Sequence, residues 1–216
     1  MPRQLQPELL DRLPAEHPDA LHSRRDLRVI NALMGNHRWL ERTLAAALCK
    51  GDRVLEIGAG TGELGRRLAA AGRPADGLDL APRPPGWPAD RDWHSANLLS
   101  FDGYGRYDAV VGNLIFHHFT DAELAALGRA LGDSVRVIVA CEPARSRFSQ
   151  GLFALMAPLF RANRVTRHDA HVSIAAGFRG EELPRQLGLD ATAWNCHCRT
   201  TARGAYQMVA RRTAPG

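Results

Sequence analysis

The chain has 216 residues, of which 45% are hydrophobic and 24% are charged, ordinary values for one globular domain. Its net charge is +5, but the arginines are scattered and do not form the clustered stripe typical of nucleic-acid-binding proteins, so we expect no nucleic-acid partner. No apolar run approaches the roughly 20 residues that a membrane-spanning helix needs. The N-terminus lacks the basic-then-apolar plan of a secretory signal, and the four cysteines have no disulfide-framework spacing. We therefore expect a cytoplasmic protein with reduced thiols.

The first 50 residues predict helices. Four prolines interrupt residues 1–20, leaving room for a short helix around 7–13. An apolar periodicity over 21–34 predicts a second helix that ends at Gly35, and we expect Asn36 to cap a third. We interpret residues 1–50 as a helical lid segment placed before one domain of residues 51–216.

The most informative stretch is Val-Leu-Glu-Ile-Gly-Ala-Gly-Thr-Gly-Glu-Leu-Gly, residues 54–65. Residues 54–57 predict a buried parallel strand, and apolar positions from Leu64 onward predict a helix. Between them, the three glycines can adopt positive φ and let a ligand approach bare backbone. The free N–H groups of the helix N-terminus favour an anionic or polar ligand.

This turn is not a dinucleotide-binding fingerprint, because Glu63 occupies the position of its third glycine. It resembles instead the first motif of class I S-adenosylmethionine-dependent methyltransferases, Glu/Asp-x-Gly-x-Gly-x-Gly. The resemblance implies an α/β, Rossmann-like seven-stranded sheet of order 3-2-1-4-5-7-6 with an antiparallel last strand. It also implies S-adenosyl-L-methionine as cofactor, with S-adenosyl-L-homocysteine as product. Glu56 would order the methionine end of the cofactor, and the turn would admit it through Gly58, Ala59, Gly60 and Gly62.

A second strand is predicted at residues 77–80. Asp79 lies about 20 residues past the turn, where an acid at a strand end can accept both ribose hydroxyls, with Leu80 next to it. Residues 81–92 are proline-rich and predict a loop in place of a regular helix. After the third strand, the resemblance implies that Asn97 or the backbone beside it contacts the adenine edge, with Leu98 against the ring.

The fourth strand, predicted at 107–112, is followed by Asn113, His117 and His118. Ligands of open α/β sheets bind at the carboxyl ends of strands, so we expect Asn113 at the cofactor and the histidines at the rim of the site. A helix over 121–131 should begin with a capping box of Thr120 and Glu123. The Asn-Pro-Pro-Tyr motif of base and glutamine methyltransferases is missing here. The paired histidines resemble the small-molecule group that includes quinone and polyketide methyltransferases.

A fifth strand over 135–140 leads to Glu142, for which we expect a site role and a pairing with Arg145. Residues 143–160 predict an amphipathic helix that could form an apolar wall. Farther along, His168 stands next to Asp169 and is our leading candidate for a general base, followed by His117 and His118, because imidazole titrates near neutral pH.

The C-terminal part predicts a short helix at 181–187 and an antiparallel hairpin of residues 193–200 and 205–211. Cys196-His197-Cys198 lies in the first of these strands, where the cysteines share one face and the histidine points the other way. A second ligand pair at zinc spacing is missing, so we predict no metal site.

The functional hypothesis is S-adenosylmethionine-dependent O-methylation of a small aromatic or polyketide-like substrate. Three alternatives stay open: an RNA (rRNA) or protein methyltransferase, a non-catalytic cofactor-binding partner subunit, and a nicotinamide oxidoreductase. Salt-dependent RNA binding would favour the first, and no turnover of phenols would favour the second. The glycine spacing argues against the third. The sequence does not indicate the acceptor atom or the oligomeric state.

Overall fold

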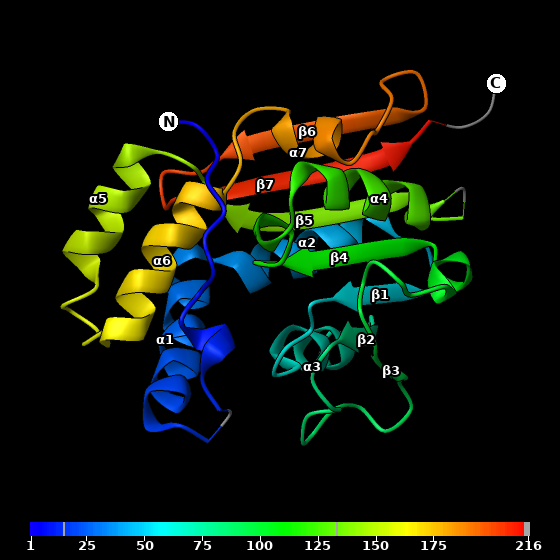
Figure 1. Ribbon diagram of the computed structural model, residues 1–216. Helices are drawn as coiled ribbons and strands as arrows, with labels where there is room; N and C mark the ends of the chain where they lie inside the picture. Colours follow the sequence, from blue (N-terminus) through cyan, green and yellow to red (C-terminus); the bar gives the residue numbers. More distant parts are fainter. Residues whose placement is uncertain (15, 133, 214–216) are drawn as a thin grey trace.

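The computed structural model describes residues 1–14, 16–132 and 134–213. Within them, seven strands form one sheet in the order β3-β2-β1-β4-β5-β7-β6 (Figure 1). Strands β1 to β5 are parallel, and β7 runs antiparallel to both of its neighbours. The predicted fold class and strand order are therefore confirmed. The strands are β1 Val54–Ile57, β2 Asp76–Asp79, β3 Trp93–Ser95, β4 Ala109–Asn113, β5 Val137–Pro143, β6 Trp194–Thr200 and β7 Ala205–Arg212.

Most helices follow the predicted positions, but no helix was predicted over 164–176, and the helix predicted around 7–13 is a 3₁₀ turn over 10–12. The predicted helix over 143–160 begins later, because β5 continues through Pro143 and Ser146 caps the new helix. No described helix is long and apolar enough to cross a membrane. The helices are α1 Pro18–Met34, α2 Asn36–Ala47, α3 Glu63–Ala70, α4 Asp121–Leu131, α5 Arg147–Met156, α6 Arg164–Ala176 and α7 Glu182–Gln186, with short 3₁₀ turns η1 Leu10–Arg12, η2 Gly103–Arg106 and η3 Phe116–His118.

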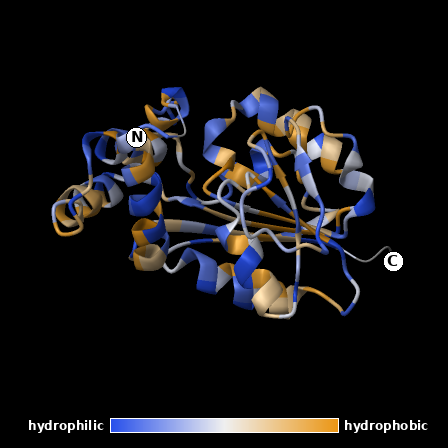
Figure 2. Ribbon diagram, turned by 90° about the horizontal axis from the view of Figure 1, so that it is seen from below, coloured by the Kyte–Doolittle hydropathy of each residue, from blue (hydrophilic) through white to orange (hydrophobic). Residues whose placement is uncertain are grey.

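Both faces of the sheet are covered by apolar side chains, and Figure 2 shows the largely hydrophobic sheet nearly edge-on between helices. One core contains side chains of α2 and α3, such as Leu40 and Leu64, packed against Val111 and Val139. The other contains side chains of α4 and α7, such as Leu124 and Leu183. Helix α2 therefore belongs to the layer that covers the sheet; the proposed division into residues 1–50 and 51–216 stays a prediction.

The three predicted helix caps have different outcomes. Thr120 and Glu123 form the expected capping box at α4. Gly35, at φ +74°, ends α1 as expected. Asn36, however, is the first residue of α2 and makes no side-chain cap. The prediction of a cap was wrong because the Asn36 amide bonds to Asn31 and Asn113 instead.

The proline-rich connection between β2 and β3 contains no helix, as predicted. It carries Trp87, whose buried ring covers two glycines. A Cβ placed on Gly65 would lie 2.3 Å from that ring, and one placed on Gly77 would lie 2.9 Å away. These glycines are therefore required for Trp87 to pack against α3 and β2.

The elements α1, α5 and α6 gather beyond the carboxyl ends of β4 and β5, and the N-terminal segment runs past α6 at the same edge (Figure 1). Arg3 donates hydrogen bonds to the carbonyl groups of Phe119 and Ala176. Leu9 and Leu10 donate their backbone N–H groups to Asp169. We call residues 3–11 the N-terminal strap, because they connect η3 with α6.

Gly128 of α4 lies against Leu187 at the C-terminal end of α7, and a substitution tests this close contact. A Cβ placed there would lie 1.8 Å from the carbonyl oxygen of Leu187. We expect Gly128→Ala to lower the free energy of unfolding by about 1–3 kcal/mol, since overpacking outweighs the gain in helix propensity. Urea unfolding measures the change.

Gly151→Ala is the matched control, because its Cβ would meet nothing within 4 Å in helix α5. It should raise stability by up to about 1 kcal/mol. Equal effects of the two substitutions would contradict the assigned contact.

Candidate active site

The glycine turn after β1 is tied to the end of β2. Gly58, Gly60 and Gly62 all have positive φ, at +64°, +52° and +70°. Gly58 N–H donates to the carbonyl group of Leu78 at 2.8 Å, and Gly60 N–H donates to Asp79 Oδ2 at 2.8 Å. The predicted turn and the predicted acid therefore lie together at the carboxyl edge of the sheet.

Glu56 is buried beneath this turn, with only 3% of its surface exposed. Its Oε2 atom has no hydrogen-bond partner among the described residues. Burial raises the pKa of this carboxyl to about 8, although the backbone N–H of Gly65 partly opposes the shift. A carboxylate in this position would be stabilised by a cationic or hydrogen-bond-donating ligand.

Three asparagine side chains connect the helical segment with the sheet at the same edge. Asn36 Nδ2 donates to Asn31 Oδ1 at 3.0 Å and to Asn113 Oδ1 at 3.2 Å. Asn113 Nδ2 donates to Asn31 Oδ1 at 2.9 Å. Asn36 Oδ1 is buried without a partner among the described residues, so this cluster retains one unused acceptor.

After β4 the backbone turns sharply. Leu114 adopts φ +58°, an unusual conformation for a residue with a side chain. The turn directs three successive backbone N–H groups at the buried carboxylate of Glu142. Those of Ile115 and Phe116 donate to its Oε1 at 2.9 and 3.0 Å, and that of His117 donates to its Oε2 at 3.3 Å.

His117 lies between two carboxylates. Its Nδ1 is 2.6 Å from Glu142 Oε2, and its Nε2 is 3.4 Å from Glu8 Oε1 of the strap. Burial opposes the charge on His117, but Glu142 and Glu8 outweigh it and raise the imidazole pKa to about 9. Burial likewise disfavours the charge on Glu8, but hydrogen bonding to His117 and its charge lower that pKa to about 2.

The other two histidines at this edge have different surroundings. Burial and the charge of His117 lower the pKa of His118. His168 Nδ1 is 3.0 Å from Asp169 Oδ1, and 41% of its side chain is exposed. Since Asp169 also binds Leu9 and Leu10, and Glu8 lies at His117, all three histidines border the strap.

A protein-family model described as a methyltransferase domain matches residues 11–189. The chain belongs to the methyltransferase domain family. The match covers all of the elements described at this edge apart from the strap residues before Asp11. No curated protein matches the chain in sequence.

Solved structures show the same class I methyltransferase fold. The plantazolicin methyltransferase BamL, crystallised with a triazolic analogue and SAH, is 12% identical over 94% of this chain and 92% of its own, with a TM-score of 0.67. Magnesium protoporphyrin IX methyltransferase (ChlM) from Synechocystis PCC 6803 is 17% identical over 88% and 86%, with a TM-score of 0.56. A structure from work on thioacetal formation in echinomycin biosynthesis is 20% identical over 82% of each chain, with a TM-score of 0.57.

The methyltransferase places most of the predicted cofactor residues at one edge, with Leu80, Asn97 and Leu98 beside it. The Leu98 side chain is buried in the core, next to Tyr104, whose hydroxyl donates to the carbonyl group of Leu98. Asn97 is exposed, with its Oδ1 accepting the N–H of Leu99, and the contacts of Asn97 and Leu98 with an adenine stay predictions. Leu80 is also exposed. The residues at the shared edge are Glu56, Gly58, Ala59, Gly60, Gly62, Asp79 and Asn113.

The sequence interpretation also missed several contacts. Glu142 does not pair with Arg145; that arginine instead binds Glu182 and the carbonyl groups of Gly177 and Met1. The correction follows from the turn after β4, which brings backbone donors and His117 to Glu142. The contact of Glu8 with His117 could not be predicted from a sequence pattern, since Glu8 lies more than 100 positions before His117.

Glu8, His117 and His118 each offer one metal-ligand atom, and these atoms lie within 4.8 Å of one another. Both nitrogens of His117 already face carboxylates, so we interpret the cluster as an ion-pair network. The absence of a metal site stays a prediction.

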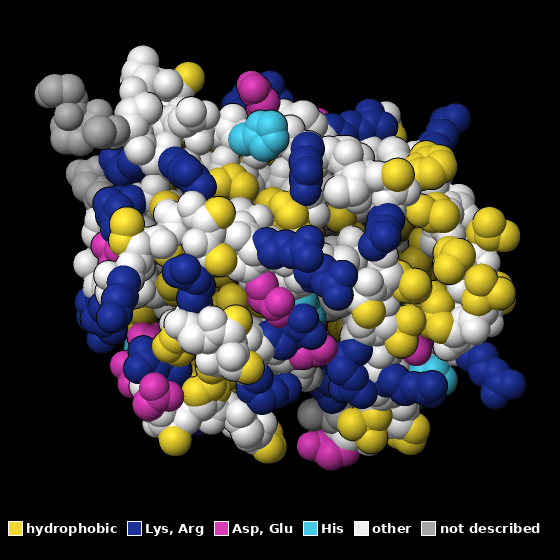
Figure 3. All heavy atoms as spheres, turned by 180° about the vertical axis from the view of Figure 1, so that it is seen from behind, with side chains coloured by type: hydrophobic (Ala, Val, Ile, Leu, Met, Phe, Trp, Pro, Cys, Tyr) yellow, Lys and Arg dark blue, Asp and Glu magenta, His cyan; other side chains and the backbone are white. Residues whose placement is uncertain are grey.

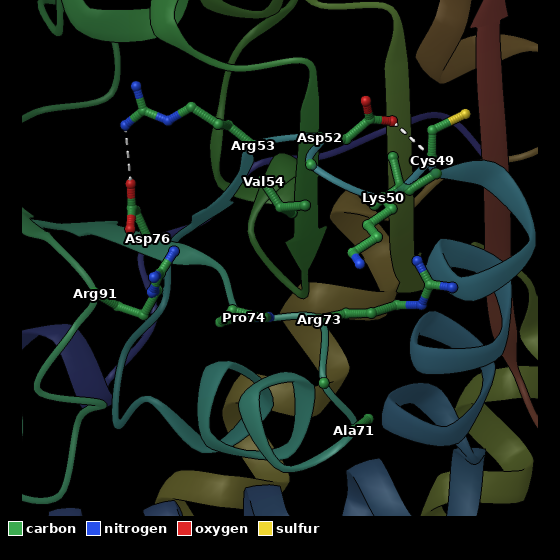
Figure 4. Close-up of a pocket in the computed structure, with 13 residues that line it drawn as sticks. Cys49, Lys50, Asp52, Arg53, Val54, Ala71, Arg73, Pro74, Asp76 and Arg91 are labelled. Atoms are coloured by element: carbon green, nitrogen blue, oxygen red, sulfur yellow. Dashed lines mark hydrogen bonds and ion pairs between the residues drawn. The ribbon is translucent and has the colours of Figure 1, made fainter.

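A cavity of about 540 Å³ lies at the opposite edge of the sheet, before β1 and β2 (Figure 4). Lys50, Arg73 and Arg91 line it, and Arg53 pairs there with Asp76. Because ligands of open α/β sheets bind at the carboxyl ends of strands, we do not assign this cavity to the active site.

Glu56→Gln tests the buried carboxyl. A raised native pKa means that the folded protein binds more protons than the unfolded chain between pH 4.5 and about 8. Stability due to this group is present below pH 4.5 and lost as the pH rises through about 8. Between pH 5 and 8, the free energy of unfolding of the wild type should fall by at least about 1.4 kcal/mol more than that of Glu56→Gln, a difference equivalent to one pKa unit. Urea unfolding at both pH values measures it, with Glu181→Gln as control; equal losses in wild type and Glu56→Gln would contradict the assignment.

Glu8→Gln tests the strap contact. Removing the Glu8 charge should lower the pKa of His117 from about 9 by about one unit or more. The His117 contribution to stability is present below pH 6.5 and lost as the pH rises through the folded pKa, so the variant should lose it at lower pH. NMR titration of the imidazole C–H resonances gives the pKa. Glu16→Gln is the control, and an unchanged His117 pKa in Glu8→Gln would refute the contact.

Proposed function

We propose that this methyltransferase transfers a methyl group from S-adenosyl-L-methionine to a small molecule, and that the acceptor is a hydroxyl of an aromatic or polyketide-like compound. The observation that carries the proposal is the junction of the glycine turn with Asp79, through the hydrogen bond from Gly60 N–H. An acid at this position can accept ribose hydroxyls, and the glycines leave the backbone accessible.

The residues at the edge fit this cofactor. Glu56 has an unpartnered buried oxygen on one side of the turn, and Asn36 has another at the asparagine cluster. Both are acceptors, and the methionine end of the cofactor carries an ammonium group. The cofactor would supply an activated methyl group on a sulfonium. The chain itself would bind the ribose through Asp79 and orient the methionine end through Glu56 and Asn113.

A hydroxyl acceptor must lose its proton, which requires a neutral base at the site. At neutral pH, His117 is protonated, because its pKa is about 9. While Glu8 stays in place, His117 therefore donates hydrogen bonds and does not accept the substrate's proton. His168 keeps its role as proposed base, since Asp169 can hold Nδ1 as donor and leave Nε2 as acceptor. His118, whose pKa is lowered, is the second candidate. Glu142 then acts as a positioning residue through His117.

The choice of a small substrate is supported by the names of the structural neighbours, which act on plantazolicin and magnesium protoporphyrin IX. A non-catalytic partner subunit would bind the cofactor but turn over no member of a panel of phenols.

Calorimetric titration with S-adenosyl-L-homocysteine tests the cofactor, with NAD as the control ligand. We expect the first to bind and the second not to bind. Asp79→Ala should weaken binding about a hundredfold or more, as loss of two hydrogen bonds to a charged group would do. Asp102→Ala, an exposed acid outside the site, should bind like the wild type. Unchanged affinity in Asp79→Ala, or preference for NAD, would rule out the proposed binding mode.

The base is tested by kinetics with phenolic acceptors. His168→Ala should lower kcat at least about a hundredfold, the lower range for general base catalysis, while cofactor affinity stays unchanged. If His118→Ala shows that loss and His168→Ala keeps full activity, the base assignment moves to His118. Full activity in both variants would eliminate both histidines.

A further inference from the structure

Helix α5 exposes its apolar side. Phe148 and Leu155 are 64% and 72% exposed, and Leu159 in the turn after the helix is 74% exposed. Among the ten residues of α5 the only buried one is Ser149. Amphipathic helices usually turn their apolar stripe to the core; here Leu152, Phe153 and Met156 are half-buried, whereas Phe148 and Leu155 lie on the solvent side. Large exposed apolar patches commonly mark interaction sites.

The same segment is strongly basic. No Asp or Glu occurs between Glu142 and Asp169. That stretch contains five arginines, of which four are exposed: Arg147, Arg161, Arg164 and Arg167. Figure 3 shows hydrophobic side chains gathered on the right-hand margin of the molecule, on the side of α5, with cationic side chains at the borders. We call α5, the following turn and the first turn of α6 the α5 surface, residues 147–167.

We propose that the α5 surface docks onto a lipid bilayer that contains anionic phospholipids. Apolar side chains on a helix can enter the interface between headgroups and acyl chains, while flanking arginines bind the phosphates. The net charge decides against a second copy as occupant. A symmetric dimer through this surface would bring arginines of one protomer against those of the other, with no acid in the segment to pair with them.

The α5 surface also contains an apolar groove. A groove of about 180 Å³ between α5 and α6 is lined by Phe153, Ala154 and Ile174, with Arg167 and His171 among its other lining residues. This combination suits an acyl chain beside a phosphate-bearing headgroup. Because α5 lies beyond the carboxyl end of β5 (Figure 1), docking would turn the candidate site toward the bilayer. The inference depends on this surface alone and holds whether or not the proposed O-methylation is correct.

Vesicle sedimentation of the full chain tests the proposal. Vesicles of equal parts phosphatidylcholine and phosphatidylglycerol should bind the protein, and pure phosphatidylcholine should bind it at least about tenfold more weakly. High salt should weaken binding, because screening acts on the arginine–phosphate attraction. The triple variant Phe148→Ser, Leu155→Ser and Leu159→Ser should lose about tenfold or more in affinity. Its fold is checked by thermal unfolding, which exposed substitutions should change little.

A charge-reversal pair separates specific docking from net charge. Arg147→Glu with Arg164→Glu should abolish binding, whereas Arg38→Glu with Arg42→Glu, on exposed positions of α2, makes the same change in net charge and should bind nearly as the wild type does. No binding to anionic vesicles would overturn the proposal, as would equal loss in both pairs. A wild-type dimer that the serine variant converts to monomer would also overturn it, in favour of a second copy.

Discussion

The buried carboxylate of Glu142 organises the candidate-site edge of this methyltransferase. An isolated charge at 0% exposure would be very costly, and here it is offset by three backbone N–H donors and one imidazole. These donors can converge only because the chain reverses at Leu114, with positive φ. The strained turn and the buried charge are therefore coupled: the carboxylate stabilises the turn, and the turn supplies the donors.

This coupling extends to the strap. Glu142 pairs with Nδ1 of His117, so the opposite nitrogen faces Glu8, and the ion pair between the imidazolium and Glu8 holds residues 3–11 across the ends of β4 and β5. Neighbouring histidines then acquire different chemistry: His117 stays charged, and its charge helps to keep His118 neutral. The position of the strap and the protonation state of His117 are linked, since displacing Glu8 removes one of the two carboxylates that hold the imidazolium.

What the sequence revealed was local or periodic. The glycines, Glu56 and Asp79 could be predicted because a turn and a strand end have fixed spacing, and the strand order followed from the family resemblance. The Thr120 capping box is equally local. By contrast, the partners of Glu142, Asn36 and Glu8 come from distant elements, and nothing in a single sequence specifies which of several polar side chains will meet. The Arg145 interpretation failed because it assumed that a neighbour in sequence is a neighbour at the site.

The α5 segment shows a different limit. Its apolar spacing predicts a helix correctly, but the same stripe serves for packing against a core, a substrate or a bilayer. The distinguishing signal is what surrounds the stripe. Helices that bury their apolar face against the same protein have no need to exclude acids, whereas a surface that approaches anionic phosphates is weakened by each Asp or Glu. The acid-free run from Pro143 to His168, together with a helix whose only buried residue is a serine, therefore favours the bilayer over the protein core as the environment of Phe148 and Leu155.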